Sequence, residues 1–301
     1  MSNYVIETRD LTVYYGKHRG IKDVNLTVEQ GEVFGFLGPN GAGKTTTQRV
    51  LLDVFPPTSG KATVFGLDCQ KDGVELRSHV GYLPGELALY ANMKASEFFQ
   101  MYEYLRSANG AKGHWRELAK RLDLDTSRKI RQFSRGNKQK VGVVAAFMSR
   151  PDLLILDEPT GGLDPLVQQT VLEMVREVKA DGRTVFFSSH ILPEVQAVCD
   201  RVGIIRSGEI IEMQKVEDMV AARMNRITMI FEELPPAGTF KISGVTETNR
   251  SEKSITLEVT ENLPQVLSAA AQNRIKDIET HNISLEDIFL AYYSKEESDH
   301  V

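Results

Sequence analysis

The sequence predicts an α/β protein in which helices cover a parallel β-sheet, followed by a small α+β domain. Three short runs indicate the parallel strands: Val33–Leu37, Leu153–Leu156 and Thr184–Phe187. Each is almost continuously apolar, as strands buried on both faces are, rather than alternating in polarity. Each is followed by a polar loop and then by a helical pattern. This order is typical of open α/β sheets, which bind ligands at the carboxyl ends of their strands.

Residues 1–220 are expected to form this α/β domain, with a helical subdomain inserted at about residues 87–150. Within the insert, Lys94–Arg106 and Gly113–Leu122 have the periodicity of amphipathic helices, and no strand pattern is evident. We predict a separate α+β domain over residues 221–301.

The predicted C-terminal domain combines alternating strands with helices. Apolar and polar residues alternate over Ile227–Phe231 and Ile255–Val259, which is typical of half-buried strands. Leu263–Asn273 and Ser284–Tyr293 have helical patterns, and Ser284 is the predicted N-cap of the second. Regulatory, dimerising and bracing roles all stay open for this domain.

The composition is that of a globular protein with about two domains. Of its 301 residues, 41% are hydrophobic and 26% are charged, and the formal net charge is −5. The acidic balance disfavours nucleic acid as a partner, and no apolar run approaches the roughly 18 residues that span a bilayer. Cys69 and Cys199 form neither a CxxC nor a zinc pattern, so we expect reduced thiols in an intracellular protein without a secretory signal.

A glycine-rich segment, GPNGAGKT, fits the phosphate-loop pattern G-x-x-x-x-G-K-[ST] between a strand and a helical stretch. Its glycines permit positive φ, and its N–H groups with the following helix N-terminus form a cradle for phosphate. The alternative is a glycine turn without function, which the strand–loop–helix setting disfavours. The residues predicted to bind nucleotide are Gly38, Pro39, Asn40, Gly41, Ala42, Gly43, Lys44, Thr45 and Thr46.

Two acids, Asp157 and Glu158, follow the strand Leu153–Leu156 directly. A strand end brings carboxylate oxygens close to a nucleotide-bound magnesium ion. We predict that Thr45 and Asp157 hold Mg²⁺, and that Glu158 orients the attacking water. A merely solvated acidic pair is the alternative, and the phosphate loop makes it the weaker one.

A second anion site is predicted at Phe133-Ser-Arg-Gly-Asn-Lys-Gln-Lys140, which precedes an apolar helical face. Ser134 and Gly136 stand at the start of that helix, where N–H groups and the helix dipole favour anions. One chain does not need two sites for one phosphate. Two chains arranged head to tail do, because each segment then closes over the phosphate loop of its partner.

The ordered segments resemble the ATP-binding subunits of ABC transporters over about residues 1–220. The match rests on GPNGAGKT, FSRGNKQK, LLILDEPT, GGLD at residues 161–164, and His190. The resemblance implies a P-loop NTPase fold of the ABC ATPase type that hydrolyses ATP in a sandwich dimer, expected here to be a homodimer. It also implies separate integral membrane permease subunits, which would hold the protein at the cytoplasmic face of the cell membrane.

The resemblance assigns further roles by position. Tyr15 would stack on adenine, and Asp164 would lie in the loop that couples the two active sites. His190 would contact the γ-phosphate and complete a catalytic set with Glu158 and Lys44.

The chain departs from the family pattern in two places. Arg135 and Asn137 replace residues of the usual LSGGQ signature, and this variant resembles exporter ATPases, so the expected direction is export. Arg135 either adds charge near phosphate or faces solvent. Gly85 stands where the family has a glutamine near Mg²⁺, and whether Glu86 takes over that role stays open.

Several alternatives are weighed against transport. A non-transport ABC ATPase is disfavoured because the chain has a single cassette and no heptad run interrupts it. A regulatory ATP-binding module is disfavoured by the presence of Glu158 and His190, and a small-molecule kinase by the signature and GGLDP segments, which its chemistry does not need. In the helical insert, the expected docking surface for the permease, Trp115 is interpreted as subdomain core rather than as a docking anchor.

Overall fold

The computed structural model describes three stretches of the chain, residues 4–106, 112–221 and 225–281. The chain divides into two units, Met1–Val216 and Glu217–Val301. The predicted helix Ser284–Tyr293 lies outside the described residues. No helix within the described stretches is long and apolar enough to cross a bilayer.

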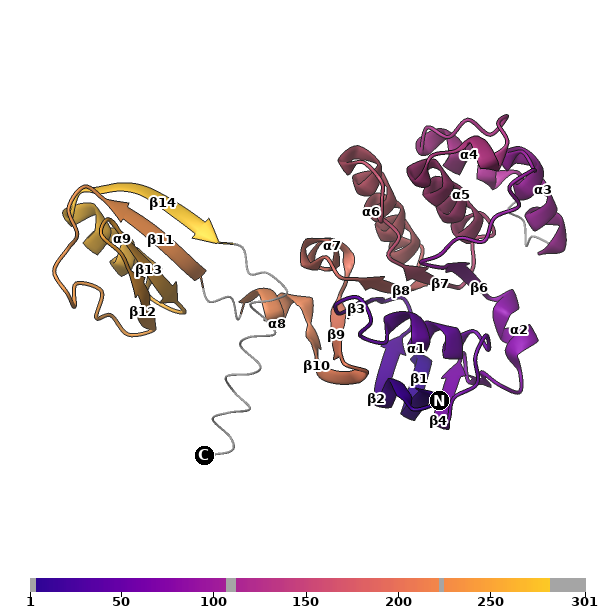
Figure 1. Ribbon diagram of the computed structural model, residues 1–301, viewed down its shortest axis with the longest axis horizontal. Helices are drawn as coiled ribbons and strands as arrows, with labels where there is room; N and C mark the ends of the chain where they lie inside the picture. The colour runs from indigo at the N-terminus through magenta and orange to yellow at the C-terminus, as the bar shows by residue number, and fades with distance from the viewer. Residues whose placement is uncertain (1–3, 107–111, 222–224, 282–301) are drawn as a thin grey trace. The chain divides into compact units, whose positions relative to one another are not determined.

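The first unit is built on a six-stranded sheet of order β10-β9-β3-β8-β7-β6 (Figure 1). All neighbouring pairs are parallel except β9 and β10. Every residue of β3, β7 and β8 is buried, which confirms the strands predicted from their apolar runs. The strands are β3 (Val33–Leu37), β6 (Val80–Leu83), β7 (Leu153–Asp157), β8 (Thr184–Ser189), β9 (Arg201–Arg206) and β10 (Glu209–Lys215).

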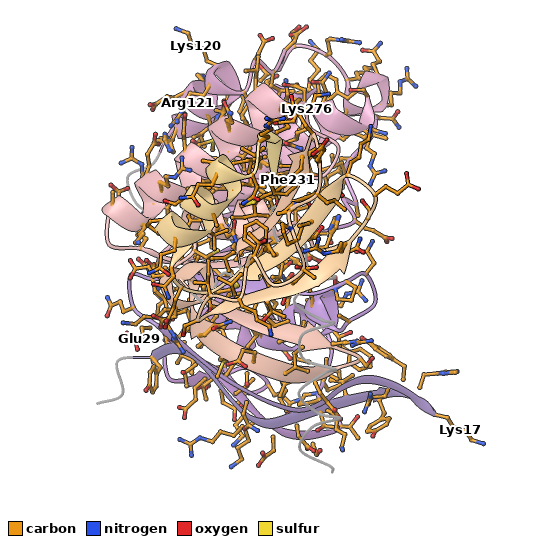
Figure 2. The ribbon with its side chains drawn as sticks, turned by 90° about the vertical axis from the view of Figure 1, so that its left-hand side faces the viewer. Lys17, Glu29, Lys120, Arg121, Phe231 and Lys276 are labelled. Atoms are coloured by element: carbon orange, nitrogen blue, oxygen red, sulfur yellow. The ribbon has the colours of Figure 1, made fainter. Side chains whose placement is uncertain are left out.

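A second, antiparallel sheet of order β2-β1-β4-β5 packs in the same unit, and the sequence analysis did not predict it. Its strands are β1 (Tyr4–Tyr15), β2 (His18–Glu29), β4 (Ser59–Val64) and β5 (Leu67–Asp68). Lys17, in the turn between β1 and β2, points out to solvent (Figure 2). The register of β1 and β2 shifts several times, which interrupts the simple alternation that marks a strand in a sequence.

One hydrophobic core joins the two sheets. Phe34, Phe36 and Phe186 from the central sheet share a buried cluster with Ile6 and Val24 from the antiparallel sheet. The ring of Phe186 lies 5.7 Å from that of Phe34 and 5.3 Å from that of Phe36. The cluster thereby fixes β3 and β8, whose ends carry two of the predicted site segments.

Helices complete the first unit. The helical subdomain contains α3 (Ala95–Leu105), α4 (His114–Arg121) and α5 (Arg135–Phe147), with α5 packed against both other helices and against β6. Trp115 is buried, with its ring 5.5 Å from that of Phe99, so it belongs to the subdomain core as predicted. The remaining helices of this unit are α1 (Lys44–Leu51), α2 (Gly73–Ser78), α6 (Pro165–Ala180) and α7 (Leu192–Val198), whereas α8 (Val216–Ala221) begins at the last residue of the first unit and otherwise belongs to the second.

The second unit contains a four-stranded antiparallel sheet of order β12-β13-β11-β14. Its core includes Met229, Phe231, Leu257 and Val266, which come from β11, β13 and the helix α9. The strands around residues 227–231 and 255–259 and the helix after residue 263 were predicted, whereas the edge strands were not. The elements are β11 (Asn225–Phe231), β12 (Val245–Arg250), β13 (Ser254–Val259), α9 (Leu263–Gln272) and β14 (Ile275–His281).

We expect Phe186→Ala to destabilise the first unit by about 3–5 kcal/mol, because it leaves a cavity between two buried rings. Urea unfolding followed by the fluorescence of Trp115, the sole tryptophan, measures the change. Val74→Ala is the control, since Val74 is 80% exposed, and should change stability by less than about 0.5 kcal/mol. Equal unfolding midpoints for the two variants would contradict this account of the core.

Candidate active site

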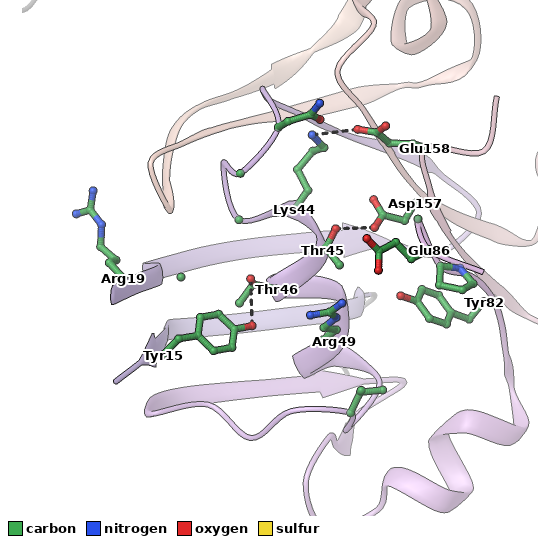
Figure 3. Close-up of a pocket in the computed structure, with 17 residues that line it drawn as sticks. Tyr15, Arg19, Lys44, Thr45, Thr46, Arg49, Tyr82, Glu86, Asp157 and Glu158 are labelled. Atoms are coloured by element: carbon green, nitrogen blue, oxygen red, sulfur yellow. Dashed lines mark hydrogen bonds and ion pairs between the residues drawn. The ribbon is translucent and has the colours of Figure 1, made fainter. Parts of the chain in front are cut away.

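A cavity of about 720 Å³ opens where the loops after β3, β6 and β7 meet the ends of β1 and α1 (Figure 3). Lys44, Thr45 and Thr46 from the predicted phosphate loop line it, together with Asp157 and Glu158. The other lining residues are Tyr15, Arg19, Gly20, Asn40, Gly41, Gly43, Arg49, Val54, Tyr82, Pro84, Gly85 and Glu86.

The phosphate loop closes around the side chain of Lys44, the first residue of α1. Its Nζ donates to the carbonyl oxygens of Gly38 at 2.7 Å and Pro39 at 3.1 Å, and the residue is only 5% exposed. Gly43 has φ +113°, and a Cβ there would lie 2.6 Å from Ile21 Cγ2, so only glycine fits. The loop is therefore shaped for an anion at the start of α1.

Asp157 is 2% exposed, and both of its carboxylate oxygens accept short hydrogen bonds. Thr45 Oγ1 donates to Oδ2 at 2.6 Å, and Ser188 Oγ donates to Oδ1 at 2.6 Å. Thr45 and Asp157 both line the cavity, and a hydroxyl with a carboxylate is a donor set that suits Mg²⁺. The residues present thus fit the predicted metal.

Glu158 meets two basic side chains at the edge of the cavity. Its Oε1 lies 3.0 Å from His190 Nδ1 and 3.5 Å from Lys44 Nζ. The backbone of Glu158 is left-handed, with φ +49°. The three predicted catalytic residues therefore come together, although they belong to the segments after β3, β7 and β8.

Gln139 is a contact of this segment that the sequence analysis did not identify. Its Nε2 donates to the carbonyl oxygens of Glu158 at 3.2 Å and Pro159 at 3.1 Å. No local pattern marks the residue, because its partners lie on another element.

Two tyrosines stand at the rim of the cavity. Tyr15 lies against Phe55, with ring centroids 4.9 Å apart, and its hydroxyl is 3.3 Å from Thr46 Oγ1. Burial, assisted by the charge of Asp157, raises the pKa of Tyr82 to about 12. The Tyr82 phenol therefore stays protonated beside the acidic groups at physiological pH.

Gly85 and Glu86 both line the cavity, as expected for the segment that departs from the family pattern. A Cβ at Gly85 would lie 3.0 Å from Asp157 Oδ2, the oxygen that also meets Thr45. Figure 3 shows the Glu86 side chain beside Thr45 and Asp157. Gly85 thus leaves room beside the Asp157 carboxylate, and the polar side chain of this segment is that of Glu86.

Ser134, Gly136 and Asp164 lie outside the set of residues that lines the cavity. Ser134 caps α5 by accepting from Asn137 N at 3.3 Å, and Asp164 caps α6 by accepting from Val167 N at 3.1 Å. A Cβ at Gly136 would lie 2.9 Å from Gly162 O, so the signature and GGLD segments are close neighbours. Their separation from the phosphate loop is what a site shared between two copies requires.

The comparisons with known proteins agree with this geometry. A family model described as ABC transporter matches residues 21–161. The ABC transporter ATP-binding protein NatA of Bacillus subtilis (strain 168) is 39% identical over 206 residues, which cover 67% of this chain and 84% of that protein. The chain belongs to the ATP-binding subunits of ABC transporters. It is accordingly an ABC-type ATPase that binds and hydrolyses ATP.

Other relatives and a solved structure match the chain over similar or longer stretches. The uncharacterized ABC transporter ATP-binding protein YcbN of Bacillus subtilis (strain 168) is 32% identical and covers 95% of this chain and 96% of its own length. The bacitracin transport ATP-binding protein BcrA of Bacillus licheniformis is 38% identical over 69% of each chain. A solved ATP-binding subunit of an ABC transporter superposes with a TM-score of 0.66 and 29% identity, covering 71% of this chain and 91% of that one.

We expect Lys44→Ala to weaken ATP binding by roughly 10- to 100-fold, since a hydrogen bond to a charged group contributes about 1.5–3 kcal/mol. Titration with a fluorescent ATP analogue measures the affinity. Lys120, which projects from α4 (Figure 2), provides the control Lys120→Ala, and this variant should bind as the parent does. Full affinity and turnover in Lys44→Ala would reject the assignment of the phosphate loop.

Proposed function

We propose that two copies of this ATPase subunit clasp two Mg·ATP head to tail and power export through separate membrane permease subunits. The observation that carries the proposal is the convergence of Lys44, Glu158 and His190 beside the Thr45–Asp157 pair. An anion cradle, a metal-binding pair and a hydrolytic carboxylate are the parts that phosphoryl transfer to water needs.

In the proposed ATP complex, the loop residues Gly38–Thr46 hold the phosphates and Tyr15 stacks on the adenine. Thr45 Oγ1 and Asp157 Oδ2 hold Mg²⁺, which when bound neutralises charge on the phosphoryl oxygens. Tyr15 is 38% exposed and stands beside Thr46, so one face of its ring is available for a base.

Hydrolysis depends on a competition for Lys44. Its ammonium group is 3.5 Å from the Glu158 carboxylate. A γ-phosphate beside Lys44 would compete for that charge and leave Glu158 to accept a hydrogen bond from water. The water oxygen then attacks the γ-phosphorus as its proton moves to Glu158, and the bond to the β–γ bridging oxygen breaks. His190, 3.0 Å from Glu158, keeps the carboxylate oriented and would contact the γ-phosphate in the ATP complex, although it is not among the residues that line the cavity.

The second half of each site would come from the partner copy. In one chain, Ser134 and Gly136 stand at the start of α5, away from the chain's own phosphate loop. The N–H groups and dipole at that helix start suit a γ-phosphate bound to another copy. Asp164 at the start of α6 would lie near the boundary between the two copies. Closure then follows ATP binding, because ATP binds the closed pair more tightly.

The membrane partners and the direction are inferred from the family and the signature. The relative BcrA is named for bacitracin transport. The FSRG signature of this chain resembles that of exporters with separate membrane chains. We therefore place the ATPase at the cytoplasmic face of the cell membrane, with the helical subdomain on the permease.

Replacing Glu158 with glutamine should lower kcat by about 100-fold or more, since the amide keeps the shape but cannot accept the proton. ATP binding should persist, so dimers accumulate with ATP and appear as doubled mass in light scattering after gel filtration. The exposed Glu173 on α6 gives the control Glu173→Gln, expected to turn over normally. Parental turnover in Glu158→Gln would show that another group activates the water.

Mixing Ser134→Ala and Lys44→Ala chains should regain turnover, because a mixed dimer contains one site with both halves intact. Each variant alone breaks both sites of its homodimer. The control is a chain with both substitutions mixed with the parent, whose mixed dimers contain no intact site and should be inactive. Turnover of the control mixture is compared with that of the same amount of parental chain alone, because parental homodimers in it stay active. A first mixture no more active than its two variants would mean that the sites are not shared between chains.

A further inference from the structure

We propose that Glu194, a buried carboxylate outside the cavity, is a positioning residue that sets Glu158 against His190. The inference rests on the proposed hydrolytic roles of those two residues. In the described part of the chain, Glu194 forms no hydrogen bond with either residue. Its hydrogen bonds are to Thr160, two residues after Glu158, and to Ser189, directly before His190.

Both oxygens of Glu194 are used, although the residue is only 7% exposed. Thr160 Oγ1 donates to Oε1 at 2.5 Å, and Ser189 Oγ donates to Oε2 at 2.8 Å. Thr160 and Ser189 are themselves 2% and 1% exposed. The three side chains form a closed bridge away from solvent, where hydrogen bonds to a charged group are strong.

The bridge joins the two segments that carry the hydrolytic pair. Thr160 lies two residues after Glu158 in the loop that leaves β7, and Ser189 directly precedes His190 at the end of β8. The backbone link between the strands ends with Glu158 N donating to Ser188 O at 3.0 Å. After that bond, the relative position of the loops that follow β7 and β8 depends on contacts between side chains.

Within the described chain, two side-chain hydrogen bonds connect residues 158–164 with residues 189–194. One is the Glu158–His190 contact itself, and the other is Thr160–Glu194. Ser189 Oγ also accepts from Ile191 N at 2.9 Å, which closes the turn around His190. The bridge therefore fixes the loop geometry on which the 3.0 Å contact depends.

Glu158 needs such support because its own backbone is strained. A non-glycine residue with φ +49° is in an unfavourable conformation and persists only where its surroundings enforce it. Gln139 holds the carbonyl oxygens of Glu158 and Pro159 from one side. The Thr160–Glu194 bond fixes the following residue from α7, so the strained residue lies between two restraints.

Stability alone gives a weak reason for this carboxylate. Burying an ionised carboxylate lowers stability unless a nearby opposite charge offsets the loss of hydration. In the described part of the chain no salt bridge joins Glu194 to a cation, and its hydrogen-bond partners are two hydroxyls. An apolar side chain would fill such a buried place at lower cost, whereas only a fixed pair of acceptors ties the two loops together.

Thr160→Val tests the bridge, since it removes one hydroxyl and keeps the side-chain shape. We expect kcat of the full-length chain to fall by about tenfold, as small misplacements of reacting groups do, with KM for ATP within about twofold. The matched control is Thr8→Val. Thr8 is equally buried, and its hydroxyl donates to Val24 O at 2.8 Å and accepts from Leu26 N at 3.0 Å, in the antiparallel sheet. Thr8→Val should lower the thermal midpoint without changing kcat.

Glu194→Gln and Glu194→Ala provide a graded second series. Glutamine keeps the shape and one accepting oxygen, so kcat should fall less than with alanine. Adding Thr160→Val to Glu194→Ala should cost nothing further, because the bond is already absent. A normal kcat in Thr160→Val, or losses that simply add in the double variant, would overturn the inference.

The parental chain and Glu158→Gln are assayed in parallel. Parental turnover that depends on Glu158 supports the proposed function independently, and a normal kcat in Thr160→Val then counts against Glu194 alone. If Glu158→Gln turns over like the parent, the proposed role of Glu158 fails first, and the positioning role fails with it.

Discussion

The site depends on the parallel pairing of β3, β7 and β8, which brings three strand ends to one edge of the sheet. Leu37 pairs with Ser189, and Asp157 pairs with Ser188, so the residues that follow each strand are neighbours in space. The ladders are rigid because all three strands are fully buried. Short loops after these strands are therefore sufficient to bring Lys44, Glu158 and His190 together. The strand pairing fixes their positions although they lie far apart in the sequence.

Charge compensation follows from that geometry. Lys44 is nearly buried and is satisfied by two carbonyl oxygens and the Glu158 carboxylate. A buried ammonium without such partners would be unstable. The two carbonyl oxygens and the carboxylate thereby fix the position of the ammonium group at the phosphate loop. Asp157 is likewise held by Thr45 and Ser188, which orient its oxygens in advance.

The features that sequence reasoning found are those with local causes. Val33–Leu37 is apolar throughout because both of its faces are covered, and the phosphate loop is recognisable because its turns require glycine at fixed spacing. The antiparallel sheet was missed because bulges in β1 and β2 disturb the alternation, and β12 because its largely exposed residues follow no period. Gln139 and Glu194 were missed for another reason. The partners of Gln139 lie 19 and 20 residues away, and Thr160, one of the two partners of Glu194, lies 34 residues away, so no spacing rule encodes these bonds.

Gln139 links the helix that begins at the signature segment to the segment that carries Glu158. The helix α5 begins beside Ser134, which is proposed to meet the nucleotide of a partner copy, and it carries Gln139 in its second turn. The Gln139 amide grips the carbonyl oxygens of Glu158 and Pro159. A shift of α5 toward a partner would therefore pull directly on the segment that holds the chain's own hydrolytic carboxylate. The two hydrogen bonds of Gln139 therefore tie the position of α5 to the backbone of Glu158, the residue whose alignment with His190 the proposed hydrolysis needs.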